Sequence, residues 1–220
     1  TRKLSACWKR ARVRGAVFGS KAGWERPNWF APAGVEPVDR PSFDWPNWFE
    51  HVAAEHRSVR EGVAMIDQSS FAKMEVFGAK ALDCLQRLAV ANIDRPLGSV
   101  IYTQLCNERG GIEADLTICR LEEDRFYVVT GTAYGEHDFG WIRRHLPEDG
   151  SVRTVDVTSG YAVLNLCGPK SRQVLGQVAE EDVGNGAYGF SLLRELTIGA
   201  APVRALRVSF TGELGYELHI

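Results

Sequence analysis

The sequence contains no long hydrophobic run and no clustered cysteines. No apolar stretch approaches the roughly 20 residues that a membrane-spanning helix needs, and no apolar signal core occurs in these residues. The five cysteines occur singly, with no CxxC pair and no histidine spacing typical of a zinc site. We therefore expect no metal site, no membrane partner, and a reducing compartment, because an odd, scattered set of thiols does not suit a disulfide framework.

Common nucleotide and hydrolase motifs are missing as well. No GxGxxG follows a predicted strand, and neither GxxxxGK[ST] nor GxSxG occurs, so the residues predict neither a self-contained nucleotide-binding domain nor a serine hydrolase. Charge does not indicate nucleic-acid binding, because 26 Lys and Arg against 28 Asp and Glu leave a net charge of -2. The 220 residues, 45% hydrophobic and 25% charged, are typical of one large or two small globular domains.

Tryptophan and proline concentrate near the start of the chain. Four of the six tryptophans fall within 25 residues and are interleaved with prolines: Trp24, Trp29, Trp45 and Trp48, with Pro27, Pro32, Pro37, Pro41 and Pro46. The prolines exclude a regular helix or a central strand, and the aromatics argue against disorder. We predict an extended arm over residues 1–50, strapped across a folded domain formed by residues 51–220. The arm serves either for packing alone or as the wall of a substrate tunnel or a seam between domains.

Short strands and helices alternate through the rest of the chain. Hydrophobic periodicity predicts helices over 43–63, 78–88, 134–146 and 172–178, and strands over 63–70, 71–77, 126–129, 152–157, 161–166, 191–197, 203–210 and 216–220. This mixture predicts an α+β fold with mostly antiparallel sheets. Internal similarity between the two halves is too faint to detect. The last predicted strand reaches Ile220, so we expect the domain to continue beyond it. His51 and His56 are five apart, off the same-face spacing of a helix, and are expected at the surface.

The stretch Ile101–Leu121, IYTQLCNERGGIEADLTICRL, predicts a β-hairpin that turns at the paired glycines. Its second arm alternates apolar residues with Glu113, Asp115, Thr117 and Cys119. An aspartate in the middle of a strand needs a reason, because its charge resists burial and its side chain competes for backbone hydrogen bonds. With a loop of two or four residues, pairing parity places Tyr102 on the face of Asp115. The pattern is compatible with a chemical site or with an edge strand that carries a solvated carboxylate.

Several segments together resemble a known family. In chain order they are GWERPNWFAP, IYTQLCNERGGIEADLTICRL, FYVVTGTA followed by HD and W, LCGPKS, and VSFTGELGYEL. They resemble the folate-binding portion of dimethylglycine and sarcosine dehydrogenases or oxidases, which is homologous to the aminomethyltransferase, or T protein, of the glycine cleavage system. The resemblance implies a ferredoxin-like, Greek-key fold around a tetrahydrofolate channel. It also implies an upstream FAD domain and a downstream barrel domain, neither of which this sequence includes.

The same resemblance implies a set of site residues. The aspartate of the hairpin, Asp115, matches the family's catalytic carboxylate, which lies at the folate nitrogens. The positions implied to bind the cofactor tetrahydrofolate are Tyr102, Thr117, Gly131, Phe210 and Glu217. Departures from the T proteins occur at Thr130-Gly131 in place of Asn, at Phe210 in place of Tyr, and at Ala114 in place of a second aspartate. These departures argue against handling of a lipoyl-carried aminomethyl group.

The expected function is capture of an iminium or formaldehyde unit as 5,10-methylenetetrahydrofolate. The one-carbon unit comes from a small methylated amine that the FAD domain oxidises. The alternatives are a non-catalytic folate-binding or interdomain scaffold module, and an aminomethyltransferase-like demethylase acting on a methylated sulfur or amine compound. The expected location is the bacterial cytoplasm or the mitochondrial matrix. The identity of the amine and the oligomeric state are left open by the sequence.

Overall fold

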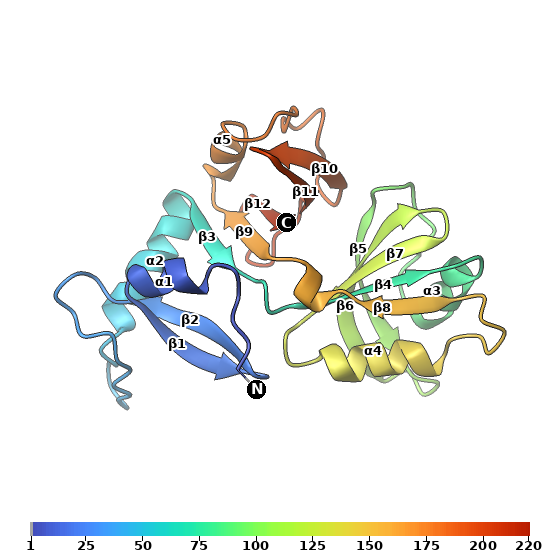
Figure 1. Cartoon of the computed structure of the whole chain (residues 1–220), viewed down its shortest axis with the longest axis horizontal. Helices are drawn as coiled ribbons and strands as arrows, with labels where there is room; N and C mark the ends of the chain where they lie inside the picture. Colours follow the sequence, from blue (N-terminus) through green and yellow to red (C-terminus); the bar gives the residue numbers. More distant parts are fainter. Residues whose placement is uncertain (1) are drawn as a thin grey trace.

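The computed structural model describes residues 2–220, and its N-terminal part is not an extended arm throughout. This part contains α1 (Trp8–Val13), β1 (Ala16–Lys21), β2 (Trp24–Phe30) and α2 (Phe49–Glu61), with β1 and β2 forming an antiparallel hairpin (Figure 1). The extended arm predicted for residues 1–50 is therefore wrong for residues 8–30, which form a helix and a hairpin. Pro27 fits into β2 because the pairing shifts register between Val17 and Phe18, opposite the proline, and the hairpin has no third strand.

The N-terminal part has a small core of its own. Trp29 is 1% exposed and packs with Val17 and Ala31, and Val52 of α2 joins them. His51, expected at the surface, is half-buried and its ring lies parallel to that of Trp29, with 5.4 Å between the centroids. This core therefore includes side chains from both sides of residue 50.

Two five-stranded sheets make up the remainder of the described chain. The first contains β4 (Ala72–Phe77), β5 (Val100–Cys106), β6 (Ile112–Glu122), β7 (Arg125–Thr130) and β8 (Arg153–Asp156), in the order β5-β6-β7-β4-β8. The second contains β3 (Ala64–Asp67), β9 (Val163–Cys167), β10 (Leu193–Ile198), β11 (Ala201–Leu206) and β12 (Gly215–His219), in the order β10-β11-β12-β9-β3. All strand pairs in both sheets are antiparallel, which confirms the predicted α+β class.

The two sheets repeat one topology. In the first half the order along the chain is β4, α3 (Ala81–Leu88), β5, β6 and β7, and in the second it is β9, α5 (Ser171–Leu175), β10, β11 and β12. Each strand-to-helix turn uses a glycine with positive φ, +124° at Gly78 and +116° at Gly168. The strand that precedes each half pairs with the sheet of the other half, since β3 pairs with β9 and β8 pairs with β4. Each half therefore provides one edge strand of the other half's sheet.

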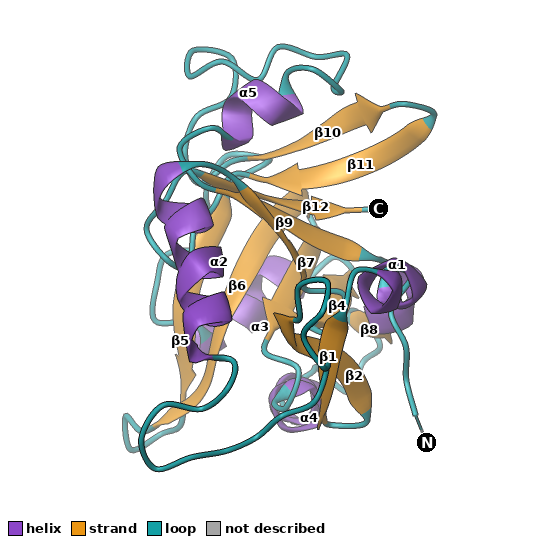
Figure 2. Ribbon diagram, turned by 90° about the vertical axis from the view of Figure 1, so that its left-hand side faces the viewer, coloured by secondary structure: helices purple, strands orange, loops and turns teal. Residues whose placement is uncertain are grey.

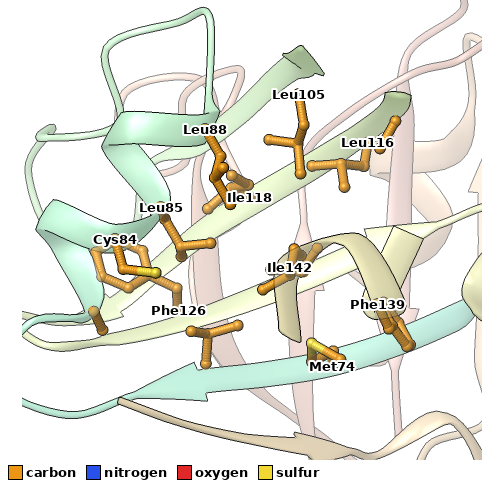
Figure 3. Close-up of a cluster of buried hydrophobic side chains, with 14 of the residues drawn as sticks. Met74, Cys84, Leu85, Leu88, Leu105, Leu116, Ile118, Phe126, Phe139 and Ile142 are labelled. Atoms are coloured by element: carbon orange, nitrogen blue, oxygen red, sulfur yellow. The ribbon is translucent and has the colours of Figure 1, made fainter. Parts of the chain in front are cut away.

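Helices cover the outer face of each sheet. In the first sheet α3 and α4 (Gly135–Arg144) bury Leu85 and Ile142 against Met74 and Phe126 (Figure 3). In the second sheet α5 contacts β12, and its Leu175 joins the second core. Both views show α5 next to this sheet (Figures 1 and 2). A 3-10 turn, η1 (Thr158–Gly160), connects β8 to β9. The face of each sheet that no helix covers, its inner face, is turned toward the other sheet. The candidate site is formed by these two inner faces.

Candidate functional site

The hairpin β5–β6 positions the predicted aspartate. The register pairs Tyr102 with Thr117 and Gln104 with Asp115, so all four side chains share the inner face of the first sheet. The Tyr102 hydroxyl donates to Asp115 Oδ2 over 2.9 Å, and Gln104 Nε2 donates to Oδ1 over 3.0 Å. The predicted placement of Tyr102 beside Asp115 is confirmed. Each carboxylate oxygen accepts one hydrogen bond and keeps further lone pairs open, because the side chain of Asp115 is exposed.

Tyr102 remains a hydrogen-bond donor at neutral pH. Its hydrogen bond to Asp115 raises the pKa of the Tyr102 phenol. The protonated hydroxyl is the form that donates to a carboxylate, so the pair is stable as phenol and carboxylate. Gln104 was not singled out in the sequence, although its position two residues after Tyr102 was a signal that it lies on the same strand face.

The hairpin loop is fixed by one side chain. Asn107 Oδ1 accepts hydrogen bonds from the backbone N–H groups of Arg109 (3.0 Å) and Gly111 (2.9 Å), and Gly110 takes a φ of +77°. Asn107 Nδ2 donates to Glu113 over 2.8 Å. The loop therefore predisposes the two arms to the register that brings Tyr102 to Asp115.

Two side chains of the second arm depart from simple alternation. The pairing shifts register next to Glu113, between Leu105 and Cys106, and the Glu113 carboxylate binds Asn107 and lies 3.6 Å from His137 of α4. Glu113 is therefore not a partner of Asp115, and the expected shared face of these two carboxylates is wrong. Ile112, at the start of the arm, is 67% exposed and does not join the buried apolar face.

The second sheet contributes Glu217. It pairs directly with Asn165 of β9 and with Leu206 of β11, and 14% of its side chain is exposed. Burial, and after it the Glu217 carboxylate, raise the pKa of the Cys119 thiol. Because Cys119 lies on the inner face of the first sheet, Glu217 points from the second sheet toward that face.

A polar network connects the two sheets next to Glu217. Arg204 of β11 places its guanidinium 4.8 Å from the ring centroid of Tyr127 and 5.3 Å from that of Tyr161. Glu75 of β4 binds Arg125 over 2.6 Å and lies 3.5 Å from Arg204. Alternation along 71–77 places Lys73 and Glu75 on one face, but nothing in the sequence indicates their partners.

Lys73 is the most deeply buried charge of this network. Its side chain is 0% exposed, and its Nζ donates to the backbone carbonyls of Ser69 (2.8 Å) and Tyr161 (3.2 Å). Burial lowers the pKa of Lys73 to about 8, against the opposing attraction of Asp156 and Asp67. The lysine thus ties the turn after β3 to the segment before β9.

The remaining predicted positions, Gly131 and Phe210, differ in where they lie relative to Asp115: Val129 of β7 pairs with Thr117, so Gly131 follows the strand end that runs beside Asp115, whereas Phe210 lies in a loop. Gly131 follows β7, and a Cβ at this position would lie 3.2 Å from the ring of Tyr134, so the close approach of that ring suits glycine. Phe210 is 94% exposed in the loop between β11 and β12 and does not join the group around Asp115. The structure thus brings together Tyr102, Asp115 and Thr117 on one sheet and places Glu217 on the facing sheet.

The inner faces offer the polar groups that a pteridine needs. A pteridine presents ring nitrogens, an amino group and a carbonyl along one edge, which carboxylates and amides recognise. Next to Glu217, the buried Asn165 Oδ1 has no hydrogen-bond partner within residues 2–220. Unpaired buried polar atoms are costly unless a ligand or water binds them. The residues present therefore fit a ligand of this kind.

Two further features concern metal ions and membranes. Among residues 2–220, no group of three or more His, Cys, Asp or Glu side chains is arranged to hold a metal ion. No helix in the part of the chain that the structure describes has the length and apolar character needed to cross a bilayer.

Comparisons with known proteins agree with the fold. Residues 7–220 match the model of the GCVT N-terminal domain family. The chain is 41% identical over 205 residues to the 4-methylaminobutanoate oxidase (formaldehyde-forming) of Paenarthrobacter nicotinovorans, covering 93% of this chain and 25% of that protein. It is 34% identical over 220 residues to the mitochondrial dimethylglycine dehydrogenase of Mus musculus, covering 100% of this chain and 25% of that protein. It thus spans about a quarter of the length of these relatives.

A solved structure gives the same picture of the fold. The glycine cleavage system aminomethyltransferase T from Bartonella henselae superposes with a TM-score of 0.77 over 100% of this chain and 54% of that protein, at 24% sequence identity. The resemblance read from the five sequence segments is confirmed. Since the family match extends over nearly all of its residues, the chain belongs to the aminomethyltransferase family, through its GCVT N-terminal domain.

Proposed function

We propose that this chain is a tetrahydrofolate-binding domain that takes up a one-carbon unit released by amine oxidation in another part of a longer protein. The unit, an iminium or formaldehyde equivalent, would leave as 5,10-methylenetetrahydrofolate. The observation that carries the proposal is the Asp115 carboxylate, oriented by Tyr102 and Gln104 on the open inner face. Support also comes from two relatives whose names include formaldehyde formation and dimethylglycine oxidation.

The chemistry that folate supplies is a pair of nitrogens that accept the one-carbon unit. Asp115 has the properties needed beside them. Its carboxylate can accept a proton from an amine nitrogen or stabilise a developing cation, and its two donors remove the need to reorient it during the reaction. Tyr102, 66% exposed, offers a ring face beside the carboxylate, and Glu217 offers a second carboxylate to the amino groups of the ligand.

The test compares two substitutions of the same chemical kind. In the protein that contains this chain, Asp115→Asn should lower the rate of 5,10-methylenetetrahydrofolate formation by roughly 10²–10³-fold, the effect of removing one preorganised charge-stabilising group. Tetrahydrofolate affinity, measured by calorimetry, should change much less. The control is Asp124→Asn, an exposed aspartate in the β6–β7 turn at the other end of the hairpin strand. Undiminished turnover in the Asp115 variant would remove this residue from the mechanism.

A non-catalytic scaffold is the second candidate. It is favoured by the N-terminal part, which has its own core and leaves Trp45 71% exposed and Phe43 fully exposed. A chain that is folded by circular dichroism yet binds no folate would support the scaffold. The third candidate, a demethylase acting on a methylated sulfur or amine compound, would be identified by product analysis with candidate methyl donors.

The cellular setting follows from the same proposal. The dimethylglycine dehydrogenase relative is named as mitochondrial, and the other relative is bacterial. Five free cysteines agree with a reducing compartment. We expect the methylated amine to be oxidised by an FAD domain elsewhere in the longer protein.

A further inference from the structure

We propose that His219 is a positioning residue for Glu217: Tyr127 fixes the His219 ring with its proton on Nε2, and this N–H orients the Glu217 carboxylate toward the bound ligand. The proposal rests on the function proposed above, in which Glu217 binds the polar edge of folate. It concerns the orientation of Glu217 on the second sheet, and not Asp115 on the first.

The first step is the contact between the two sheets at Tyr127 and His219. The Tyr127 hydroxyl lies 2.9 Å from His219 Nδ1, and the two residues are 0% and 1% exposed. Within residues 2–220 the Tyr127 hydroxyl has no other hydrogen-bond partner. If Nδ1 carried the proton, the buried O–H of Tyr127 would have no acceptor, an arrangement that buried hydroxyls avoid. Tyr127 therefore donates, Nδ1 accepts, and the imidazole proton lies on Nε2.

The second step concerns the charge of both rings. Burial raises the pKa of the Tyr127 phenol, so that the hydroxyl keeps its proton. Burial lowers the pKa of His219, although the neighbouring Glu217 opposes this effect. Both rings are therefore neutral at physiological pH, and His219 Nε2 is a donor without formal charge.

The third step is the direction of the donor. His219 Nε2 is buried and has no hydrogen-bond partner within residues 2–220. The nearest carboxylate oxygen is Glu217 Oε2, at 3.6 Å. Contacts in ligand-free sites are often long and shorten when the ligand binds. Glu217 and His219 are two residues apart on β12, so they share one strand face, and a small rotation of the Glu217 side chain completes the hydrogen bond.

Arg204 keeps this arrangement in place from the side. It pairs with His219 across the β11–β12 register, and its guanidinium lies against the rings of Tyr127 and Tyr161. The Tyr127 and His219 rings meet nearly at right angles, with 79° between their planes. The rotation of His219 is thus limited, and the N–H direction is set before any ligand arrives.

The first experiment needs no ligand. In ¹⁵N-labelled protein, the imidazole nitrogens of His219 should show the Nε2–H tautomer at pH 7.5, and Tyr127→Phe should shift the population toward a mixture. The matched control is Tyr188→Phe, since Tyr188 is also 0% exposed and its hydroxyl donates to the carbonyl of Ala205, in the second core. An Nδ1–H tautomer in the unmodified protein would overturn the proposal.

The second experiment separates positioning from folding. Glutamine can accept from Tyr127 with its carbonyl and donate to Glu217 with its amide, whereas leucine can do neither. His219→Leu should weaken tetrahydrofolate binding by at least tenfold and His219→Gln by less than threefold, with the folded state of each variant checked by circular dichroism. Equal losses in both variants would overturn the proposal.

The two proposals fail in different ways. If the unmodified protein binds no folate, the proposed function is wrong and the role of His219 in ligand binding is wrong with it. If folate binds to the unmodified protein and to His219→Leu with the same affinity, only the role of His219 is wrong.

Discussion

Lys73 shows how burial and charge compete at a single residue. Its ammonium group is removed from water and is compensated by two backbone carbonyls, and no carboxylate makes a direct ion pair with it within residues 2–220. The lowering of its pKa from 10.5 to about 8 corresponds to roughly 3 kcal/mol that the folded state loses when this lysine is charged.

A pH titration of stability tests this cost. Between pH 8 and 10.5 the unfolded chain keeps the Lys73 proton and the folded chain releases it, so the Lys73 contribution to the free energy of unfolding should rise with pH. In urea unfolding, the free energy of unfolding of the unmodified protein minus that of Lys73→Met should increase across this window by up to about 3 kcal/mol. A flat difference would contradict the buried position.

Lys80 supplies the control with the opposite sign. Its hydrogen bond to Asp149 raises the pKa of Lys80, and the ion pair is exposed. The contribution of Lys80 is therefore present at neutral pH and is lost as the pH rises through its folded pKa. The free energy of unfolding of the unmodified protein minus that of Lys80→Met should therefore decrease as the pH rises through this pKa.

At the scale of residues, the sequence predicted contacts within one hairpin and missed those between sheets. Tyr102 and Asp115 were found because strand alternation and a short loop fix which side chains share a face. Tyr127 and His219 are 92 residues apart and lie on different sheets. No local period reports a pair of this kind, because its formation depends on the packing of one sheet against the other.

At the scale of elements, the strand-to-helix turns at Gly78 and Gly168 determine the geometry of each half. A Cβ at Gly168 would lie 2.5 Å from the carbonyl oxygen of Gly62 and 2.8 Å from that of Val59, and at Gly78 it would lie 2.3 Å from the carbonyl oxygen of Ser151. Backbone from a neighbouring segment thus passes directly over each turn. Only glycine combines the positive φ with this close approach.

Gly168→Ala should therefore destabilise the protein strongly. The strained φ and the two carbonyl contacts together should cost at least about 2–3 kcal/mol, measured by chemical unfolding. Gly150→Ala is the matched control, because Gly150 also has a positive φ, +73°, but nothing lies within 4 Å of its added Cβ. The control should cost about 1 kcal/mol. Equal costs at the two positions would show that the close approach does not matter.

The predicted elements were mostly present, with shifted ends. The helix predicted for 43–63 begins at Phe49 and ends at Glu61, because Pro46 lies in its first predicted turn and Gly62 stops it. The hairpin β1–β2 was missed because the prolines and aromatics of Trp24–Phe30 hide the period of a strand. Pro27 is accommodated by the register shift, which no sequence pattern predicts.

At the scale of the whole molecule, the exchange of β3 and β8 makes the two sheets interdependent. Aligning the halves on Gly78 and Gly168 places Glu75 at the position of Asn165, so equivalent side chains differ in chemistry. This explains why the repeat was not detected in the sequence. What the halves share is the path of the backbone, and each has specialised its inner face.

Native-state hydrogen exchange should report a single unfolding unit for the two sheets. With rising urea, the slowest amides of β4 and β7 and those of β9 and β12 should converge on one opening free energy, because neither sheet keeps its fifth strand without the other half. The hairpin β1–β2, which takes no part in the exchange, should open at a lower free energy. Separate opening of the β9–β12 sheet would contradict this interdependence.

The exchanged strands β3 and β8 also determine how such a protein can be divided. A cut at the exposed turn around Gly150 would leave β3 on the first fragment and β8 on the second, each the edge that the other fragment's sheet requires. Neither piece would be complete, but each would be the natural complement of the other. A gene split at this point would therefore encode an obligate heterodimer. The two four-residue strands β3 and β8 would determine which fragments associate.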